Sequence, residues 1–138
     1  MGRLSRFLRL PRGQRVVHLE AVVLDATFRL LVLAAPFSVS RSLAQRLSRF
    51  APRGDAIFAV QAVKAAGRVV PGSNCLSEAL AAWVLLAKAE GQPTLRIGVA
   101  NQPKFEAHAW VEYEGRVVIG DDSAHRFHPL QGPDLMGK

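Results

Sequence analysis

The periodicity of the hydrophobic residues changes once along this chain of 138 residues, close to Gly91 and Pro93. Before that point, apolar residues recur every three or four positions, which is the spacing of one face of an α-helix. After it, they alternate with polar residues, as in strands that bury one face. The order predicts an α+β domain, with N-terminal helices packed on a small antiparallel sheet.

Capping residues, glycines and prolines predict the element boundaries. Four helices are expected. The first spans 14–35, and the second is capped by Ser38 or Ser40 and ends near residue 50. The third spans 56–66, with Asp55 as its N-cap and Gly67 as its stop, and the fourth spans 75–90. The expected strands are 94–100, 105–113 and 116–120, with a short further strand around 126–128. Within a single domain we separate an N-terminal helical region, 1–54, that packs on a core, 55–138.

The formal net charge of +7 comes mostly from arginine. Five arginines fall every third residue near the N-terminus: Arg3, Arg6, Arg9, Arg12 and Arg15. Such a run can bind nucleic acid, an anionic membrane or an acidic peptide, or it can be a solvated terminus. Because no aromatic ladder or known nucleic-acid module accompanies it, no nucleic-acid partner is expected.

An apolar stretch, 16–37, is interrupted by Glu20, Asp25 and Arg29. Charges near the centre of a spanning helix are costly, so a membrane span is not expected. Asp25 and Arg29 are four residues apart and can pair on a helix. The N-terminus also lacks the features of a secretory signal. We therefore expect a cytoplasmic protein with at most peripheral membrane contact.

Cys75 is the single cysteine, which excludes an intramolecular disulfide. It follows Ser73 and Asn74, two good capping residues, and so falls in the first turn of its helix. Free backbone N–H groups and the helix dipole there favour a thiolate and can hold an oxyanion. A buried, inert thiol is the alternative, but this position favours a nucleophile.

His108 is the candidate base, on the same face of its strand as Trp110. If the Glu-Gly turn has two residues, unbroken pairing sets Val111 opposite Val118 and His108 opposite Asp121. A carboxylate there can accept from one ring nitrogen and leave the other facing the thiol. A single bulge would transfer this role to Asp122 or disturb it, but Asp121 is favoured.

These residues predict acyl chemistry on a thiol. The thiolate attacks a carbonyl, the imidazolium protonates the leaving amine, and water or another amine resolves the thioester. No cofactor is expected, because glycine-rich phosphate motifs are absent from the sequence. His125 and His128 are three residues apart, but a solvated tail explains them better than a metal site does.

Four segments resemble the leader peptidase of lasso-peptide biosynthesis: SNCLSEAL at 73–80, LRIGV at 95–99, FEAHAWVE at 105–112 and GRVV at 115–118. That family belongs to the transglutaminase-like cysteine peptidases and is similar to the C-terminal domain of microcin-processing proteins. The resemblance runs from residue 55 to residue 130. It implies a transglutaminase-like (papain-like) core and a catalytic triad of Cys75, His108 and Asp121.

The resemblance also implies a substrate and partners. The enzyme would remove the leader from a ribosomally made precursor peptide, so that a separate cyclase can close the macrolactam. The chain resembles the split form, which works with a separate leader-binding protein, and the cyclase is a further candidate partner. We hypothesise that the basic N-terminal helix and the sheet edge dock this complex. Transglutaminase-type amine transfer and a non-catalytic scaffold remain the alternatives.

Overall fold

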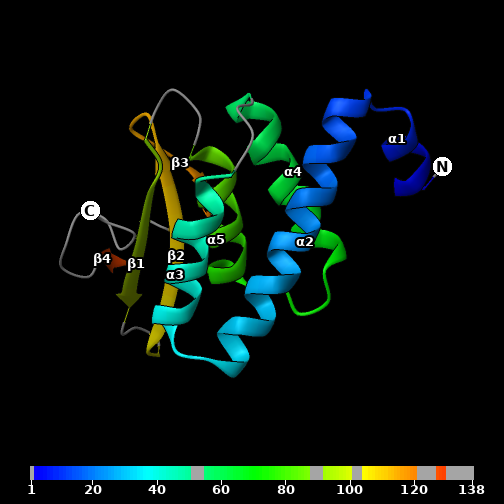
Figure 1. Cartoon of the computed structure of the whole chain (residues 1–138). Helices are drawn as coiled ribbons and strands as arrows, with labels where there is room; N and C mark the ends of the chain where they lie inside the picture. The colour runs from blue at the N-terminus through cyan, green and yellow to red at the C-terminus, as the bar shows by residue number, and fades with distance from the viewer. Residues whose placement is uncertain (1, 51–54, 88–91, 101–103, 121–126, 130–138) are drawn as a thin grey trace.

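The computed structural model describes residues 2–50, 55–87, 92–100, 104–120 and 127–129. In this part of the chain, helices precede strands, as expected for an α+β domain (Figure 1). The helices are α1 (Arg3–Leu8), α2 (Arg12–Ala34), α3 (Phe37–Ser48), α4 (Ala56–Val69) and α5 (Cys75–Leu86). The strands are β1 (Thr94–Ala100), β2 (Glu106–Tyr113), β3 (Arg116–Ile119) and β4 (His128–Pro129). They form one antiparallel sheet in the order β3-β2-β1-β4.

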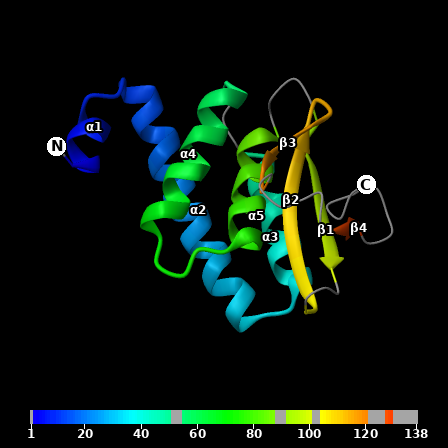
Figure 2. The ribbon, with the colours of Figure 1, turned by 180° about the vertical axis from the view of Figure 1, so that it is seen from behind.

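Helix α5 is the centre of the domain. It contacts β1, β2 and β3 on one side and α2, α3 and α4 on the other. Figures 1 and 2 show this arrangement from opposite directions, with α5 beside the sheet and α2 farther out. Eight of its 12 residues are buried, which is the pattern of a helix surrounded by protein. The helices therefore cover one face of the sheet.

The main core fills the space around α5. Its largest fully buried apolar side chains are Phe28, Leu80, Leu86, Leu95, Val63 and Val111. Each side chain of this size stabilises the fold by about 1.5–3 kcal/mol when it leaves water. Because Phe28 of α2 and Ala44 of α3 belong to the same cluster, both N-terminal helices contribute to this core. The division at residue 54 stays a prediction.

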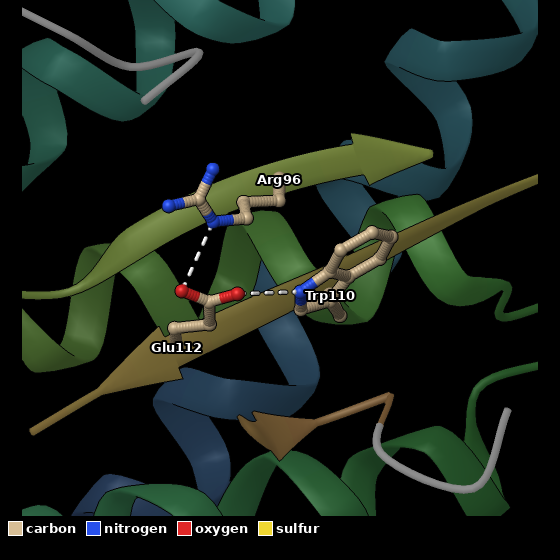
Figure 3. Close-up of polar contacts among 3 residues, drawn as sticks. All are labelled: Arg96, Trp110 and Glu112. Carbon is tan, nitrogen blue, oxygen red and sulfur yellow. Dashed lines mark hydrogen bonds and ion pairs between the residues drawn. The ribbon is translucent and has the colours of Figure 1, made fainter. Parts of the chain in front are cut away.

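A second, smaller cluster lies on the opposite face of the sheet and joins Trp110 to Ala100 and Phe127. Gly98 makes room for it, because a Cβ there would lie 2.8 Å from the indole ring. The indole N–H donates to Glu112 Oε2 at 3.0 Å, and Arg96 Nε lies 2.9 Å from Glu112 Oε1 (Figure 3). Partial burial works to raise the pKa of Glu112, but these hydrogen bonds and the arginine charge lower it below its ordinary value.

Two expected helix boundaries are wrong. The N-cap of α3 is Pro36, which offers no side-chain cap, whereas Ser40 lies fully buried within the helix. Helix α4 begins after its expected cap, Asp55, but continues through Gly67 to Val69. A Cβ at Gly67 would overlap the carboxyl group of Glu78, so this glycine serves close packing between helices instead of ending one.

The other element boundaries lie close to the expected ones. β1 spans the predicted residues, and β2 and β3 differ from prediction by one residue at one end each. Helix α5 ends at Leu86; residues 88–91, which include the predicted stop at Gly91, lie outside the described residues. None of the described helices combines the length and the apolarity needed to cross a bilayer.

Candidate active site

A cavity of about 380 Å³ lies where α4, the start of α5 and the end of β3 meet. Its lining residues are Lys64, Arg68, Cys75, Glu78, His108, Ile119 and Gly120. Two of the three predicted site residues, Cys75 and His108, therefore line the same cavity. The third, Asp121, and its alternative, Asp122, lie outside the described residues.

Cys75 is the first residue of α5, and its thiol is free and partly buried. The turn before it is closed by a reciprocal pair of hydrogen bonds. The Ser77 N–H donates to Asn74 Oδ1 at 2.9 Å, and the Asn74 N–H donates to Ser77 Oγ at 3.1 Å. The N–H groups of Cys75 and Leu76 lie in the first turn, where a helix offers no intrahelical partner. The thiol thus sits beside donors suited to a thiolate or an oxyanion.

Asn74→Ala should destabilise the protein by about 1 kcal/mol, because it removes the acceptor for the Ser77 N–H. Urea unfolding followed by circular dichroism measures the change. Asn74→Ser is the matched control, since its hydroxyl keeps an acceptor at the cap. Equal loss in both variants would contradict a capping role for the Asn74 side chain.

A buried carboxylate holds the same turn from the side of α2. Asp25 is fully buried, and its Oδ2 accepts from Ser73 Oγ at 2.7 Å. The spacing of Asp25 and Arg29 would allow an ion pair, but none occurs among the described contacts. Asp25 shares the buried face of α2 with Ala21 and Phe28, so its carboxylate is directed into the protein. Helix α2 is therefore tied to the turn that precedes Cys75.

Among the described residues, the imidazole of His108 contacts Gly120, Trp110 and Phe127. Nε2 lies 2.8 Å from the carbonyl oxygen of Gly120. Because a carbonyl oxygen can only accept, Nε2 carries the hydrogen, and in the neutral ring the lone pair is on Nδ1. The ring also stacks on Trp110 and Phe127, with centroid separations of 6.0 and 5.0 Å. These contacts fix both the orientation and the tautomer that a base requires.

Gly120 is a site residue that the sequence interpretation missed. Its φ is +81°, and a Cβ would lie 2.8 Å from the carbonyl oxygen of Ala109 and 3.1 Å from His108 Nε2. Only glycine fits here, because another residue would be strained and would crowd the imidazole. The clue in the sequence is a glycine at the end of a strand, which often marks a close approach of backbone.

The pairing of β2 with β3 contains a bulge, which corrects the expected register. The two pairs nearest the turn match the prediction, but Val111 pairs with Ile119 instead of Val118. Val118 is the extra residue, so unbroken pairing is wrong from Val111 onward. The opposition of His108 and Asp121 was counted on that unbroken pairing. With one extra residue in β3, continued counting would set Asp122 instead of Asp121 opposite His108. Both residues lie outside the described part of the chain, so the choice between them stays a prediction.

Cys75 and His108 do not bond directly to each other in the described contacts. His108 follows Trp110 onto the face of β2 that lies away from α5. The ring still lines the cavity, because β3 ends at Ile119 and the next residue, Gly120, has no side chain that would cover the imidazole. Hydrogen bonds between catalytic groups are often long in free enzymes and tighten when substrate binds.

Glu78 adds a half-buried carboxyl group to the cavity, one turn after Cys75 on α5. Burial raises the pKa of Glu78 above its ordinary value, and the negative charge of Asp25 raises it further. Among the described residues, no group of three or more His, Cys, Asp or Glu could hold a metal ion. The side chains of His125 and His128 lie outside the described part of the chain.

Glu78→Gln should stabilise the protein more at neutral pH than at low pH. Below the ordinary pKa of 4.5, Glu78 is protonated in both the folded and the unfolded state and costs no stability. As the pH rises through the raised folded-state pKa, ionisation of the half-buried carboxyl group lowers the free energy of unfolding. Glutamine cannot ionise, so the Glu78→Gln variant does not lose stability in this way as the pH rises. Thermal unfolding at about pH 4 and about pH 7 measures the difference from the wild type. The same change at the exposed Glu114 measures the effect of losing any one carboxylate, and an equal effect at both positions would contradict the prediction.

Comparison with known proteins agrees with this architecture. A sequence model of the family described as the transglutaminase-like superfamily matches residues 20–132, a range that contains both Cys75 and His108. Searches of curated proteins and of solved structures found no match. Because the family match extends over most of the chain, from α2 to β4, this protein belongs to the transglutaminase-like superfamily.

Proposed function

We propose that this protein is a cysteine peptidase that removes the leader from a ribosomally made lasso-peptide precursor. Cys75 is the nucleophile and His108 the base, and a carboxylate, Asp121 or its alternative Asp122, supplies the negative charge that stabilises the imidazolium. The superfamily includes both cysteine peptidases and acyltransferases, so the proposal goes beyond family membership. The observation that carries it is the shared cavity of Cys75, at the start of α5, and His108, whose ring is fixed by Gly120.

The proposed reaction has two stages. The thiol proton of Cys75 passes to Nδ1 of His108, and the thiolate attacks the carbonyl carbon of the scissile amide. N–H groups of the first turn of α5 stabilise the oxyanion. The C–N bond then breaks, and the imidazolium protonates the leaving amine. Water, giving a proton to His108, attacks the thioester and releases the acid together with the free thiol.

The segments around Cys75 and His108 support a leader peptide as the substrate, because they resemble leader peptidases beyond the bare catalytic residues. The leaving amine is then the new N-terminus of the core peptide. A separate cyclase would use this amine to close the macrolactam.

The test incubates this protein with a lasso-peptide precursor and a leader-binding protein, with a small primary amine added. Hydrolysis yields a free leader acid and the core peptide, whose masses together equal the precursor plus one water. Amine transfer instead yields a leader amide that carries the added amine, and that product would favour the acyltransferase alternative. Absence of cleavage with all components present would contradict the peptidase proposal.

The N-terminal helices offer a docking surface for the leader complex. Arg6, Arg9 and Arg12 are exposed, and α1, α2 and α4 enclose a largely apolar groove of about 540 Å³ beside them. Replacing all three arginines with Glu should slow processing by about tenfold, since charges at the rim of an interface set the association rate. The charge-matched control is the triple variant Arg41→Glu, Arg46→Glu, Arg49→Glu on α3 and its C-cap, whose arginines do not line this groove. Equal rates for both variants would contradict docking at this surface, and thermal unfolding checks the folded state.

A further inference from the structure

The wall of the cavity formed by α4 carries two cations. Lys64 and Arg68 are four residues apart, so they project from the same side of the helix. Both are exposed, and both line the cavity that contains Cys75. Ammonium and guanidinium groups bind carboxylates through charge-assisted hydrogen bonds.

The charged side chains that the structure describes along this cavity favour an anionic ligand. Among the described lining residues there are two cations and one acid, Glu78, together with Cys75, Ile119, Gly120 and the imidazole of His108. The Glu78 carboxyl packs closely over Gly67 and is half-buried, whereas both cations are exposed. Charges of one sign in a cleft concentrate ligands of the opposite sign. The wall of the cavity that α4 forms is therefore electropositive.

We propose that Lys64 and Arg68 form a carboxylate-binding subsite next to Cys75. It selects substrates with an acidic group close to the carbonyl that the thiol attacks. The choice of a peptide as substrate rests on the proposed function, but the subsite itself does not, because it rests on the cations and on the position of Cys75.

Alkylation of Cys75 tests the subsite without any substrate. The thiolate attacks the CH2 carbon of either iodoacetate or iodoacetamide and displaces iodide, and only iodoacetate carries a carboxylate. Cys75 is the single cysteine, so the mass of the intact protein reports its reaction alone. The ratio of the iodoacetate rate constant to the iodoacetamide rate constant does not depend on the fraction of Cys75 that is thiolate, so variants can be compared directly. We expect this ratio to exceed that of free cysteine, and to fall by about tenfold in the double variant Lys64→Glu, Arg68→Glu.

The matched control is the double variant Arg41→Glu, Arg46→Glu. It changes the net charge equally, and neither residue lines this cavity. Its ratio should equal that of the wild type. An unchanged ratio in the Lys64, Arg68 variant, or an equal fall in both variants, would overturn the subsite. The single variants Lys64→Gln and Arg68→Gln, checked by thermal unfolding, provide the same test if the double variant does not fold.

Three short peptides identify the source of the carboxylate by protecting Cys75 from iodoacetamide. They are acetyl-Gly-Glu-Gly-amide, acetyl-Gly-Gln-Gly-amide and acetyl-Gly-Gln-Gly with a free C-terminus. Stronger protection by the first supports recognition of an acidic side chain, and stronger protection by the third supports recognition of a terminal carboxylate. Equal protection by all three would contradict the subsite. Protection does not require cleavage, so these results test the subsite even if the protein proves not to be a peptidase.

Discussion

Replacing Cys75 with alanine should abolish cleavage of the precursor peptide. Without the sulfur no thioester forms, and the backbone N–H groups of α5 alone cannot replace covalent catalysis. The expected loss is at least about a thousandfold in rate, as for other enzymes stripped of their nucleophile. Cleavage is measured by mass spectrometry with the precursor and the leader-binding protein present.

Two controls test whether the loss of cleavage comes from the missing thiol and not from unfolding. Cys75→Ser keeps a hydroxyl of similar size, but a hydroxyl ionises far less readily than a thiol, so we expect activity to be largely lost here too. The side chain is only partly buried, so both variants should unfold thermally close to the wild-type temperature. Retention of cleavage by both folded variants would contradict the nucleophile assignment and favour a scaffold role.

Local signals in the sequence are sufficient to predict most of the elements. Asn74 marks the start of α5 because its side chain accepts from the N–H of Ser77, the third residue of the helix. Asp55 does the same for α4, accepting from the Ile57 N–H at 2.7 Å. The alternation of Leu95, Ile97 and Val99 with other residues predicts β1, and Leu95 and Ile97 do pack in the cluster around α5. These effects depend on neighbours within a few positions, so they can be read from the sequence.

Features that depend on distant parts of the chain could not be predicted in the same way. Gly67 appeared to end a helix, but the Glu78 carboxyl from another helix occupies the space above it. Asp25 appeared to pair with Arg29, but its partner, Ser73, is 48 residues away. The bulge at Val118 changes which residues lie opposite each other, and no local signal announced it. The candidate site was therefore predictable in its residue types and less so in its orienting contacts.

The role of Gly120 illustrates this limit. Sequence counting assigned the orientation of His108 to a carboxylate, whereas the described contact is to a backbone carbonyl. A carbonyl can fix the tautomer as a carboxylate does, but it adds no full negative charge to stabilise an imidazolium. The proposed Asp121 would supply that charge. Asp121→Asn and Asp122→Asn, compared for cleavage rate, distinguish the two candidates.

His108→Gln should lower the cleavage rate by about a hundredfold to ten-thousandfold, the usual contribution of a general base. The glutamine amide can still donate a hydrogen bond to the Gly120 carbonyl, which helps to preserve the fold. It has no basic nitrogen, so it cannot take the thiol proton. Alkylation of Cys75 by iodoacetamide at about pH 6.5 should slow as well, because the thiolate loses its imidazolium partner.

A second variant separates proton transfer from packing at this position. Phe127→Leu removes one ring that stacks on His108 but leaves the imidazole in place. It should reduce the cleavage rate far less than His108→Gln does, although both variants lose the same stacking contact. If the two losses were equal, the imidazole would act by filling space on the sheet, and the base assignment would fail. If only His108→Gln slows both cleavage and alkylation, the ring nitrogen rather than the ring's bulk serves the thiol.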